Sequence, residues 1–340
     1  MNALLFTDLL LRSLAIGALA AACVWLCPES WRGRVRRLVP VVAFTGLLVL
    51  TLGLVRPLPQ FEIAAPASIS KLGELPAWNP GAWVSAAWLA GVALCLARLT
   101  IGALAIRSLL KKTAPLPGRA WKHALADCMR AVGVRGNVGL RVAGPGFVPS
   151  ATGLFRRTIL LPDEARGWTA GERRIVLLHE LGHFRRGDLW THALGRLACA
   201  LHWFNPFAWM LHRQLTVERE FACDELVIER GAARGDYATL LWQMASAMRR
   251  RPSPAAAFLA MASPRTGTLE ERVRRILAPA RKAGRLLRIA DGMLCATLAA
   301  LLIFCTACKP VHRTLSHLGS PWDTAELEAR LTADPFPGNR

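Results

Sequence analysis

Charged residues, and acidic residues above all, are scarce in this chain of 340 residues. Only 19% of the residues are charged, 53% are hydrophobic and the mean hydropathy is +0.30. A soluble enzyme of ordinary composition has about a quarter charged residues, so this composition argues against one. The 23 Asp and Glu residues are outnumbered by 43 Lys and Arg residues, which gives a net charge of +20. Part of the chain is therefore expected to lie in lipid.

The basic excess is not accompanied by any nucleic-acid-binding signature. No zinc finger, basic zipper or RNA-binding motif surrounds the arginines, so direct nucleic-acid binding is not expected, and anchoring to anionic membrane lipid explains the charge instead. The nine cysteines do not form the two C-x-x-C pairs of a structural zinc site. Cys128, Cys199 and Cys223 are interpreted as small buried hydrophobic residues. Pairing of Cys305 with Cys308 is left open.

Four apolar stretches are predicted to be transmembrane helices, because each is near the roughly 20 residues that a helix needs to cross a bilayer. They cover residues 9–27, 38–55, 81–106 and 286–307. Lys and Arg cluster between the first two stretches and from 107 to 285, whereas the loop 56–80 carries few. Since positively charged loops stay in the cytoplasm, we predict an inner-membrane protein with both termini outside and residues 107–285 in the cytoplasm.

One motif points directly to chemistry. His179 and His183 lie four residues apart, and Glu180 directly follows the first histidine. Four residues are about one helical turn, so both imidazoles are predicted to project from one face and to hold one zinc ion per chain. Glu180 lies beside them without being a ligand, where it can take a proton from the attacking water. Apolar flanking residues argue against a solvated surface helix.

A later helix is predicted to supply the third metal ligand. Glu220 and Asp224, four residues apart, share one face of that helix. Glu220 is the predicted ligand, and Asp224 is expected to orient a ligand histidine or nearby arginines. Glu218 is the rival ligand but lies on another side of the helix. Two histidines and one carboxylate leave the fourth position to water, which is typical of a catalytic site.

Local signals predict where these helices begin and end. Thr169 and Glu172 form a capping box ahead of the histidine motif, and Gly187 supplies a left-handed stop. Asp188 is predicted to cap a second helix that runs to about residue 203. Asn205-Pro206 has the form that opens a third helix, which is predicted to end near residue 231.

The segment ahead of the motif is predicted to hold a helix at 119–134 and a β-hairpin with strands 139–142 and 158–161. An open edge of this hairpin can pair with an extended peptide substrate, although a merely structural hairpin is an equal alternative. Tyr237 is a candidate donor to the oxyanion, but packing is the commoner role of a helix tyrosine.

These residues resemble the integral membrane zinc peptidases of the BlaR/MecR antirepressor type. The resemblance is carried by segments on both sides of the histidine motif: 149–153 with 159–162, 179–188, 202–209, 218–225 and 269–277. It implies Glu220 as third ligand and Glu180 as general base. It also implies that a cytoplasmic protein, such as a transcriptional repressor or the chain itself, is cleaved in a transmembrane signalling response.

The resemblance departs from antibiotic-sensing members at the C-terminus. Residues 308–340 contain no S-x-x-K motif and no room for a penicillin-binding domain, so acylation by a β-lactam is not expected. The loop 56–80 and the tail 308–340 are the candidate sensor surfaces, and neither looks like a folded sensor domain. The identity of the substrate and the self-association of the chain are left open.

The predicted fold is a mainly α integral membrane protein with a cytoplasmic α+β, zincin-like (gluzincin) peptidase domain that contains a small β-hairpin or sheet. Residues 1–106 hold three transmembrane helices, 107–285 the zinc metallopeptidase domain, 286–307 the fourth transmembrane helix and 308–340 a short extracytoplasmic tail. The substrate-edge candidates are Ser150, Ala151 and Thr152.

Two alternatives stay open. Membrane zinc peptidases of the HtpX and CAAX-prenyl-protease kind share H-E-x-x-H, so quality-control cleavage of membrane proteins is one of them. The other is a non-catalytic membrane signalling scaffold that zinc stabilises, in which a fourth side chain such as His202 or Cys223 closes the site.

Overall fold

A computed structural model describes residues 3–27, 32–55, 61–64, 80–116, 118–145, 147–250, 269–278 and 308–311, and it is mostly helical. The chain divides by its contacts into two units: residues 1–56 together with 79–306, and residues 57–78 together with 307–340. The predicted fourth transmembrane helix, at 286–307, lies outside the described residues, as does most of the tail.

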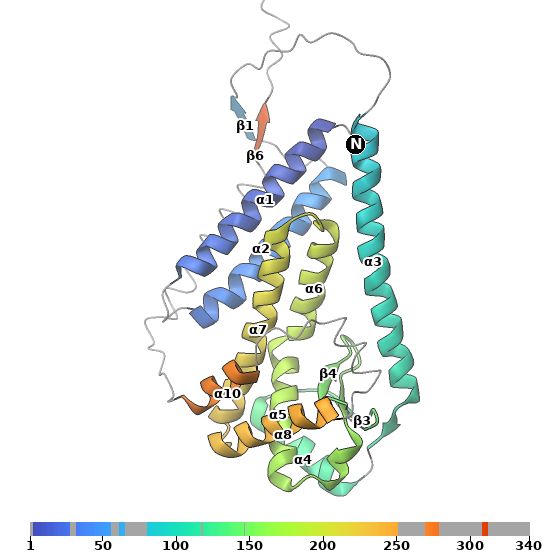
Figure 1. Cartoon of the computed structure of the whole chain (residues 1–340), viewed down its shortest axis with the longest axis vertical. Coiled ribbons are helices and arrows are strands. Elements are labelled where there is room, and N and C mark those ends of the chain that lie inside the picture. Colours follow the sequence, from blue (N-terminus) through green and yellow to red (C-terminus); the bar gives the residue numbers. More distant parts are fainter. Residues whose placement is uncertain are drawn as a thin grey trace, which may run out of the picture. The chain divides into compact units, whose positions relative to one another are not determined.

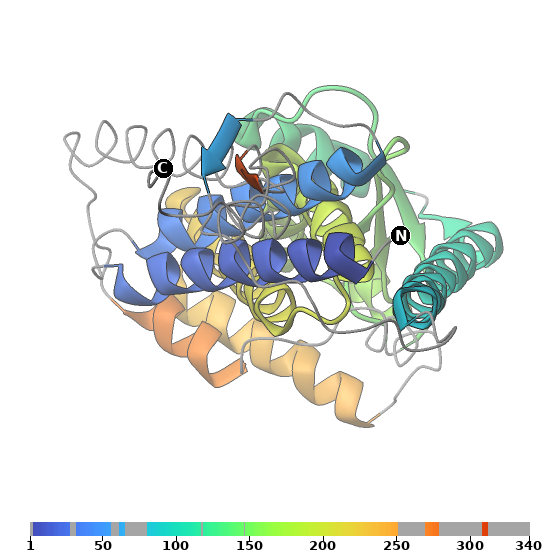
Figure 2. The same ribbon diagram turned by 90° about the horizontal axis from the view of Figure 1, so that it is seen from above.

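Three helices of the first unit are long and apolar enough to cross a membrane: α1 (Ala3–Leu26), α2 (Arg32–Val55) and α3 (Pro80–Lys112). They fall where the sequence predicts the first three spans. Helices α1 and α2 lie side by side, and α1 also contacts α3 (Figures 1 and 2). The membrane character of the N-terminal part therefore agrees with the hydropathy pattern.

The rest of the first unit holds short strands followed by a run of helices. Its elements are β2 (Ala114–Pro115), α4 (Arg119–Val132), β3 (Gly139–Val142), β4 (Ser150–Thr152), β5 (Thr158–Leu161), the 3-10 helix η1 (Asp163–Gly167), α5 (Ala170–Arg186), α6 (Asp188–Leu201), α7 (Pro206–Glu229), α8 (Arg234–Arg250) and α10 (Leu269–Leu277). The predicted helix at 119–134 thus forms within two residues of its expected end.

The strands form a four-stranded sheet in the order β2-β3-β5-β4. The prediction that 139–142 and 158–161 form a hairpin is wrong, because β3 and β5 pair in parallel, with Gly139 opposite Thr158. The connection between them is long enough for the chain to return to the same end of the sheet, as parallel pairing requires. The antiparallel hairpin is instead β4 with β5, in which Ala151 lies opposite Ile159. Strand β4 is therefore an edge of the sheet.

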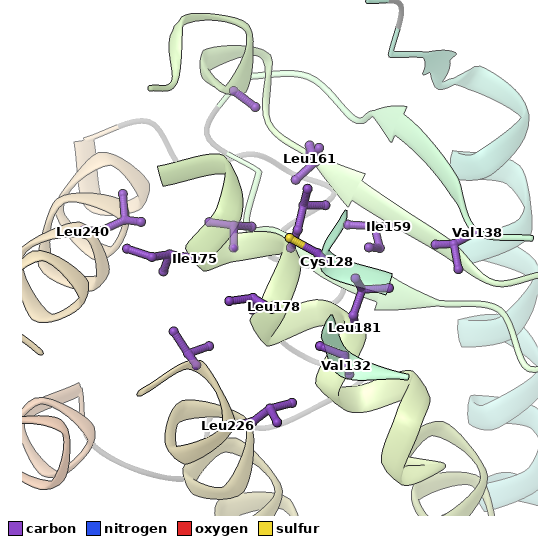
Figure 3. Packing of buried hydrophobic residues seen from close by; sticks show 14 of the residues in the cluster. Cys128, Val132, Val138, Ile159, Leu161, Ile175, Leu178, Leu181, Leu226 and Leu240 are labelled. Atoms are coloured by element: carbon purple, nitrogen blue, oxygen red, sulfur yellow. The ribbon is translucent and has the colours of Figure 1, made fainter. Parts of the chain in front are cut away.

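An apolar core joins this sheet to the helices around it. Figure 3 shows Ile159 and Leu161 of β5 against Leu178 and Leu181 of α5, with Cys128 of α4 between the layers. These five side chains are all buried. Burial of a full Leu or Ile side chain contributes about 1.5–3 kcal/mol, so α5 is fixed rigidly between α4, the sheet and α7.

Helices α6 and α7 form a hairpin that packs against all three candidate spans (Figure 1). At its tip, the Asn205 side chain donates to Ser13 of α1 (2.8 Å to the carbonyl oxygen), and the Trp88 indole of α3 donates to the Leu201 carbonyl (3.0 Å). His202 Nε2 lies 3.0 Å from Thr51 Oγ1 of α2. Ser13, Thr51 and Trp88 each lie within the part of their helix that is long and apolar enough to cross a membrane. These parts are Thr7–Leu26, Val35–Leu52 and Trp83–Lys112.

The outer face of the hairpin is apolar and exposed. It carries Trp190, Leu197, Trp209 and Met210, whereas the Trp203 ring packs against Trp88 and Gly91 of α3. Large apolar side chains exposed beside candidate spans are expected to face lipid, since exposed apolar patches of this kind mark contact surfaces. The sequence did not predict that the segment 188–229 packs along the spans.

In the second unit the structure describes only β1 (Phe61–Ala64) and β6 (Cys308–Val311), which pair in parallel. This pairing joins the loop after α2 to the segment that follows the predicted fourth span.

Candidate metal centre

Helix α5 carries the two motif histidines, and its ends follow the local signals in the sequence. Thr169 caps the first turn, with its side chain accepting from the Glu172 amide while Glu172 reaches back to the Thr169 amide. Gly187 ends the helix in the left-handed region with φ 69°, where a residue without a Cβ is favoured. Both boundaries confirm the prediction and fix the orientation of His179 and His183.

Helix α7 brings a carboxylate to these rings from the opposite side. Asn205 caps its start by accepting from the Phe207 and Ala208 amides, with Pro206 in the first position. The helix then runs past the α5 histidines to Glu229, so that Glu220 reaches them. The predicted start and approximate end are confirmed.

The structure brings His179, His183 and Glu220 together. The Nε2 atom of His179 lies 3.5 Å from Glu220 Oε2, and the Nε2 atom of His183 lies 3.8 Å from Glu220 Oε1. Their candidate ligand atoms all lie within 4.8 Å of one another. The two rings are nearly perpendicular, at 84°, so their nitrogens converge on one point from different directions. Three donors of this type in this space can hold a single metal ion.

The other nitrogen of His183 has its own partner, which the sequence analysis missed. Asp188, the second residue after α5, places Oδ2 2.9 Å from His183 Nδ1. Asp188 was predicted to cap α6, but α6 has no side-chain cap, and Gly187 occupies that position. The carboxylate instead contacts His183 and Arg186. A carboxylate that binds the far nitrogen of a ligand histidine fixes the ring and its tautomer.

Three residues, Tyr237, Asp224 and Arg272, hold the Nδ1 side of His179, and the first two of them are buried. The Tyr237 hydroxyl donates to Asp224 Oδ1 at 2.5 Å and lies 2.9 Å from His179 Nδ1. Asp224 Oδ1 is itself 3.2 Å from the same Nδ1. Arg272 of α10 donates to both Asp224 oxygens, at 2.8 and 2.6 Å, and reaches to 3.5 Å from Glu220 Oε2. Arg272 was not among the predicted site residues, although it lies in the segment 269–277 that carries part of the resemblance.

The placement of Tyr237 bears on its suggested role. Its hydroxyl lies on the Nδ1 side of His179, whereas Glu220 lies on the Nε2 side, and the side chain is buried. A donor to the oxyanion has to face the reacting carbonyl. The position of Tyr237 therefore does not favour that role, and it fits the orientation of His179.

Carboxylates contact both histidines of the site. Burial lowers the pKa of His179, but the Asp224 and Glu220 carboxylates outweigh it and raise that pKa to about 10. Burial likewise raises the pKa of Asp224, while His179 and Arg272 bring it down to about 2. The carboxylates thus stay ionised, and the potential that holds a proton on His179 also attracts a divalent cation.

The remaining predicted residues take the following places. Glu180 is buried on α5 directly after His179. Ser150, Ala151 and Thr152 form the half-buried edge strand β4, which contacts α5. Glu218, the rival ligand, instead pairs with Arg36 at the start of α2, with 3.2 Å between Nη1 and Oε1.

Neither proposed fourth ligand approaches the open side of the three donors. His202 lies at the tip of the α6–α7 hairpin against Thr51 and the Leu47 carbonyl. Cys223 Sγ lies 3.3 Å from Nδ1 of His183, which is the nitrogen that faces Asp188 and not Glu220. Within the described residues, this arrangement favours a site with an open position.

Three candidate membrane helices and a cluster of two histidines and a carboxylate are the features expected of a membrane metallopeptidase family. Residues 70–276, more than half of the chain, match the family model described as BlaR1 peptidase M56, and the chain belongs to this family. The regulatory protein BlaR1 of Bacillus licheniformis is 36% identical over 81 residues, a match that covers 24% of this chain and 14% of that protein. The resemblance drawn from the sequence motifs is thereby confirmed, although the match spans far less than two thirds of that relative's length.

Proposed function

We propose that this chain is a zinc endopeptidase of the inner membrane, which cleaves a cytoplasmic protein in a transmembrane signalling response. The observation that carries the proposal is the convergence of His179, His183 and Glu220 around one point, with Glu180 beside them. A repressor or the chain itself is the proposed substrate, in line with the regulatory name of the Bacillus relative.

The donor set fits zinc on chemical grounds. Two imidazoles and a carboxylate are the ligands of many catalytic zinc sites, which leave one position open. Each imidazole presents Nε2 to Glu220 and is bound at Nδ1 by a buried acid, Asp188 or Asp224. Such outer acids are typical partners of zinc-ligating histidines. When bound, the ion supplies Lewis-acid activation of the scissile carbonyl and of the attacking water.

The chain's own residues carry the other parts of the reaction. Glu180 takes the proton of the attacking water and later passes it to the leaving amine. Asp188 and Asp224 keep the imidazoles in place and in the correct tautomer, and Tyr237 and Arg272 support Asp224. The unpaired edge of β4 at Ser150, Ala151 and Thr152 lies in contact with α5 and can align an extended substrate by main-chain hydrogen bonds.

The proposed topology has four spans, with the peptidase on the cytoplasmic side. The parallel pairing of β1 with β6 supports it, because it requires the segments at 61–64 and 308–311 to lie on the same side of the membrane. Helix α3 crosses once between them, so a second crossing at 286–307 is needed to return. Arg and Lys at the inner ends of the spans set the orientation.

The test is the substitution Glu180→Gln in the full chain. Purified parent protein is expected to cleave a protein substrate, whereas the variant binds zinc equally well and loses at least about 100-fold in rate, the usual contribution of a general base. In cells, proteins that shorten with the parent and stay intact with Glu180→Gln identify the substrate. Cleavage by the variant at the parent's rate would overturn the proposal.

A further inference from the structure

The turn between β4 and β5 presents apolar side chains to solvent. Phe155 is 86% exposed, Leu154 is also exposed, and the basic Arg156 follows them. Across from the turn, Trp190 of α6 is 52% exposed, and its ring meets that of Phe155 edge-on at 5.3 Å. Leu154, Phe155, Arg156 and Trp190 are called the aromatic tip below.

The aromatic tip is held in a fixed conformation. Gly153 opens the turn with φ 90°, and a Cβ at this position would lie 2.0 Å from the Arg156 carbonyl oxygen, so the turn is too tight for any other residue. Arg157, at its other end, donates to the Arg135 carbonyl at 3.0 Å. The exposure of Phe155 therefore belongs to a built turn, and its apolar ring has no cover among the described residues apart from Trp190.

The contacts of α6 with α3 place the aromatic tip toward the Lys112 end of α3, which is the inner end in the proposed topology. The two helices run antiparallel (Figure 1), and the Trp88 indole of α3 donates to the carbonyl of Leu201, the last residue of α6. Trp190 lies eleven residues before Leu201, about 16 Å further along α6, and therefore toward the Lys112 end of α3. The sheet that carries the turn is attached at this end of α3, because β2 begins at Ala114, two residues after α3 ends, and lies in the same sheet as β4 and β5.

A second contact fixes the level of the metal centre independently. Glu218 of α7 pairs with Arg36, the fifth residue of α2, at the start of the segment Val35–Leu52 that is apolar enough to cross a membrane. Glu220 follows two residues later on the same helix, so it lies within about 3 Å of Glu218 along the helix axis. The candidate ligands and the aromatic tip are therefore both near the inner membrane surface.

We propose that the aromatic tip binds the anionic headgroup layer of the inner leaflet and holds the β4 edge against it, so that the substrate is a polypeptide segment lying at the membrane surface. Aromatic rings favour the headgroup level, and an adjacent arginine is attracted to lipid phosphate. Trp190 and Leu197, seven residues apart, share one face of α6, so the tip continues the exposed apolar face of the α6–α7 hairpin. This continuity favours lipid over a second copy of the chain. The substrate class rests on the proposed peptidase function.

The lipid contact is tested without reference to activity. The photo-crosslinking residue benzoylphenylalanine replaces Phe155 in the full chain, and in a control protein it replaces the exposed His123 on α4. Both proteins are placed in nanodiscs of phosphatidylglycerol and phosphatidylcholine. Illumination is expected to give a lipid adduct at 155 and none at 123, with a yield that falls several-fold in pure phosphatidylcholine or with Arg156→Ser. Absence of a lipid adduct at 155, or crosslinking to a second copy instead, would overturn the proposal.

The substrate class is tested with a fluorogenic casein-derived peptide, either free or carrying a palmitoyl chain. In anionic nanodiscs the parent is expected to cleave the palmitoylated peptide with a kcat/KM at least tenfold higher than the free one. The double variant Phe155→Ser, Arg156→Ser is expected to lose most of this preference while its kcat/KM for the free peptide is unchanged, and His123→Ser to keep both values. Equal cleavage of both peptides by the parent would refute the substrate class. Cleavage of neither would instead count against the peptidase function, and the lipid adduct still decides the contact.

Discussion

Replacement of Asp188 by asparagine should weaken zinc binding without touching a ligand. Asp188 is 4% exposed and lies 2.9 Å from His183 Nδ1. Asparagine has the same shape and keeps one acceptor oxygen, but it removes the negative charge that stabilises the ring N–H. Loss of such an outer partner typically costs 10- to 100-fold in metal affinity, which corresponds to about 1.4–2.7 kcal/mol.

The measurement is a competition titration of the full chain, in nanodiscs, against a chelating zinc indicator. Asp163→Asn is the matched control, because Asp163 is about half exposed and makes only a loose pair with Arg166, at 3.6 Å. We expect the Kd for zinc to rise 10- to 100-fold in Asp188→Asn and to stay unchanged in the control. The variant also deprives Arg186 of a partner, so its thermal unfolding is recorded without zinc. An unchanged Kd in a folded Asp188→Asn protein would refute the orienting role.

Three further predictions concern the packing and the chemistry of the peptidase part. Leu178→Ala, at a fully buried position, should destabilise the protein by about 2–5 kcal/mol and so lower its midpoint of thermal unfolding. A midpoint equal to the parent's would contradict the packing of α5. Gly187→Ala, at φ 69°, should lower the stability of the protein by about 1–2 kcal/mol, because alanine is strained in the left-handed region. The same thermal unfolding assay measures this loss, and Gly171→Ala inside α5 is the control that is not expected to destabilise. Burial raises the pKa of the Cys128 thiol from 9.0 to about 11, so its neutral form stabilises the fold below about pH 9 and that contribution is lost as the pH rises toward 11. Iodoacetamide at pH 8 should therefore leave Cys128 unmodified in the native protein and modify it after denaturation, as mass mapping would reveal, and rapid native modification would contradict its burial.

Local features of the chain were predictable because neighbouring residues determine them. The capping box at Thr169 and Glu172, the stop at Gly187 and the start at Asn205-Pro206 all depend on groups a few residues apart, and each is present. The four-residue spacing of the histidines likewise places both rings on one face of a helix. Glu220 was harder to choose from the sequence, since its approach to His179 depends on how α5 and α7 pack.

Long-range features were not predictable from the same signals. The parallel pairing of β3 with β5 depends on how the chain crosses between them, and two strand-like segments around a glycine-rich turn read equally well as a hairpin. Arg272 contacts Asp224 from a separate helix, and no pattern of neighbouring residues predicts such a contact. Asp188 was assigned to the wrong role because an acid that follows Gly187 can cap the next helix as readily as it can bind Nδ1 of His183.

The packing of α6 and α7 along the spans was also missed, for a compositional reason. The segment 188–229 mixes apolar residues such as Trp190 with Arg196, Arg219 and several acids, so its hydropathy does not resemble that of a span. One of its acids, Glu218, pairs with Arg36 of α2, while Trp190 and Trp209 remain exposed.

The zinc content of the purified full chain tests the central claim most directly. Metal analysis after dialysis should give one zinc per chain for the parent and for Glu180→Gln, and close to none for Glu220→Ala, while Glu218→Ala retains the metal. Retention of stoichiometric zinc by Glu220→Ala, or its absence from the folded parent protein, would contradict a site built from His179, His183 and Glu220.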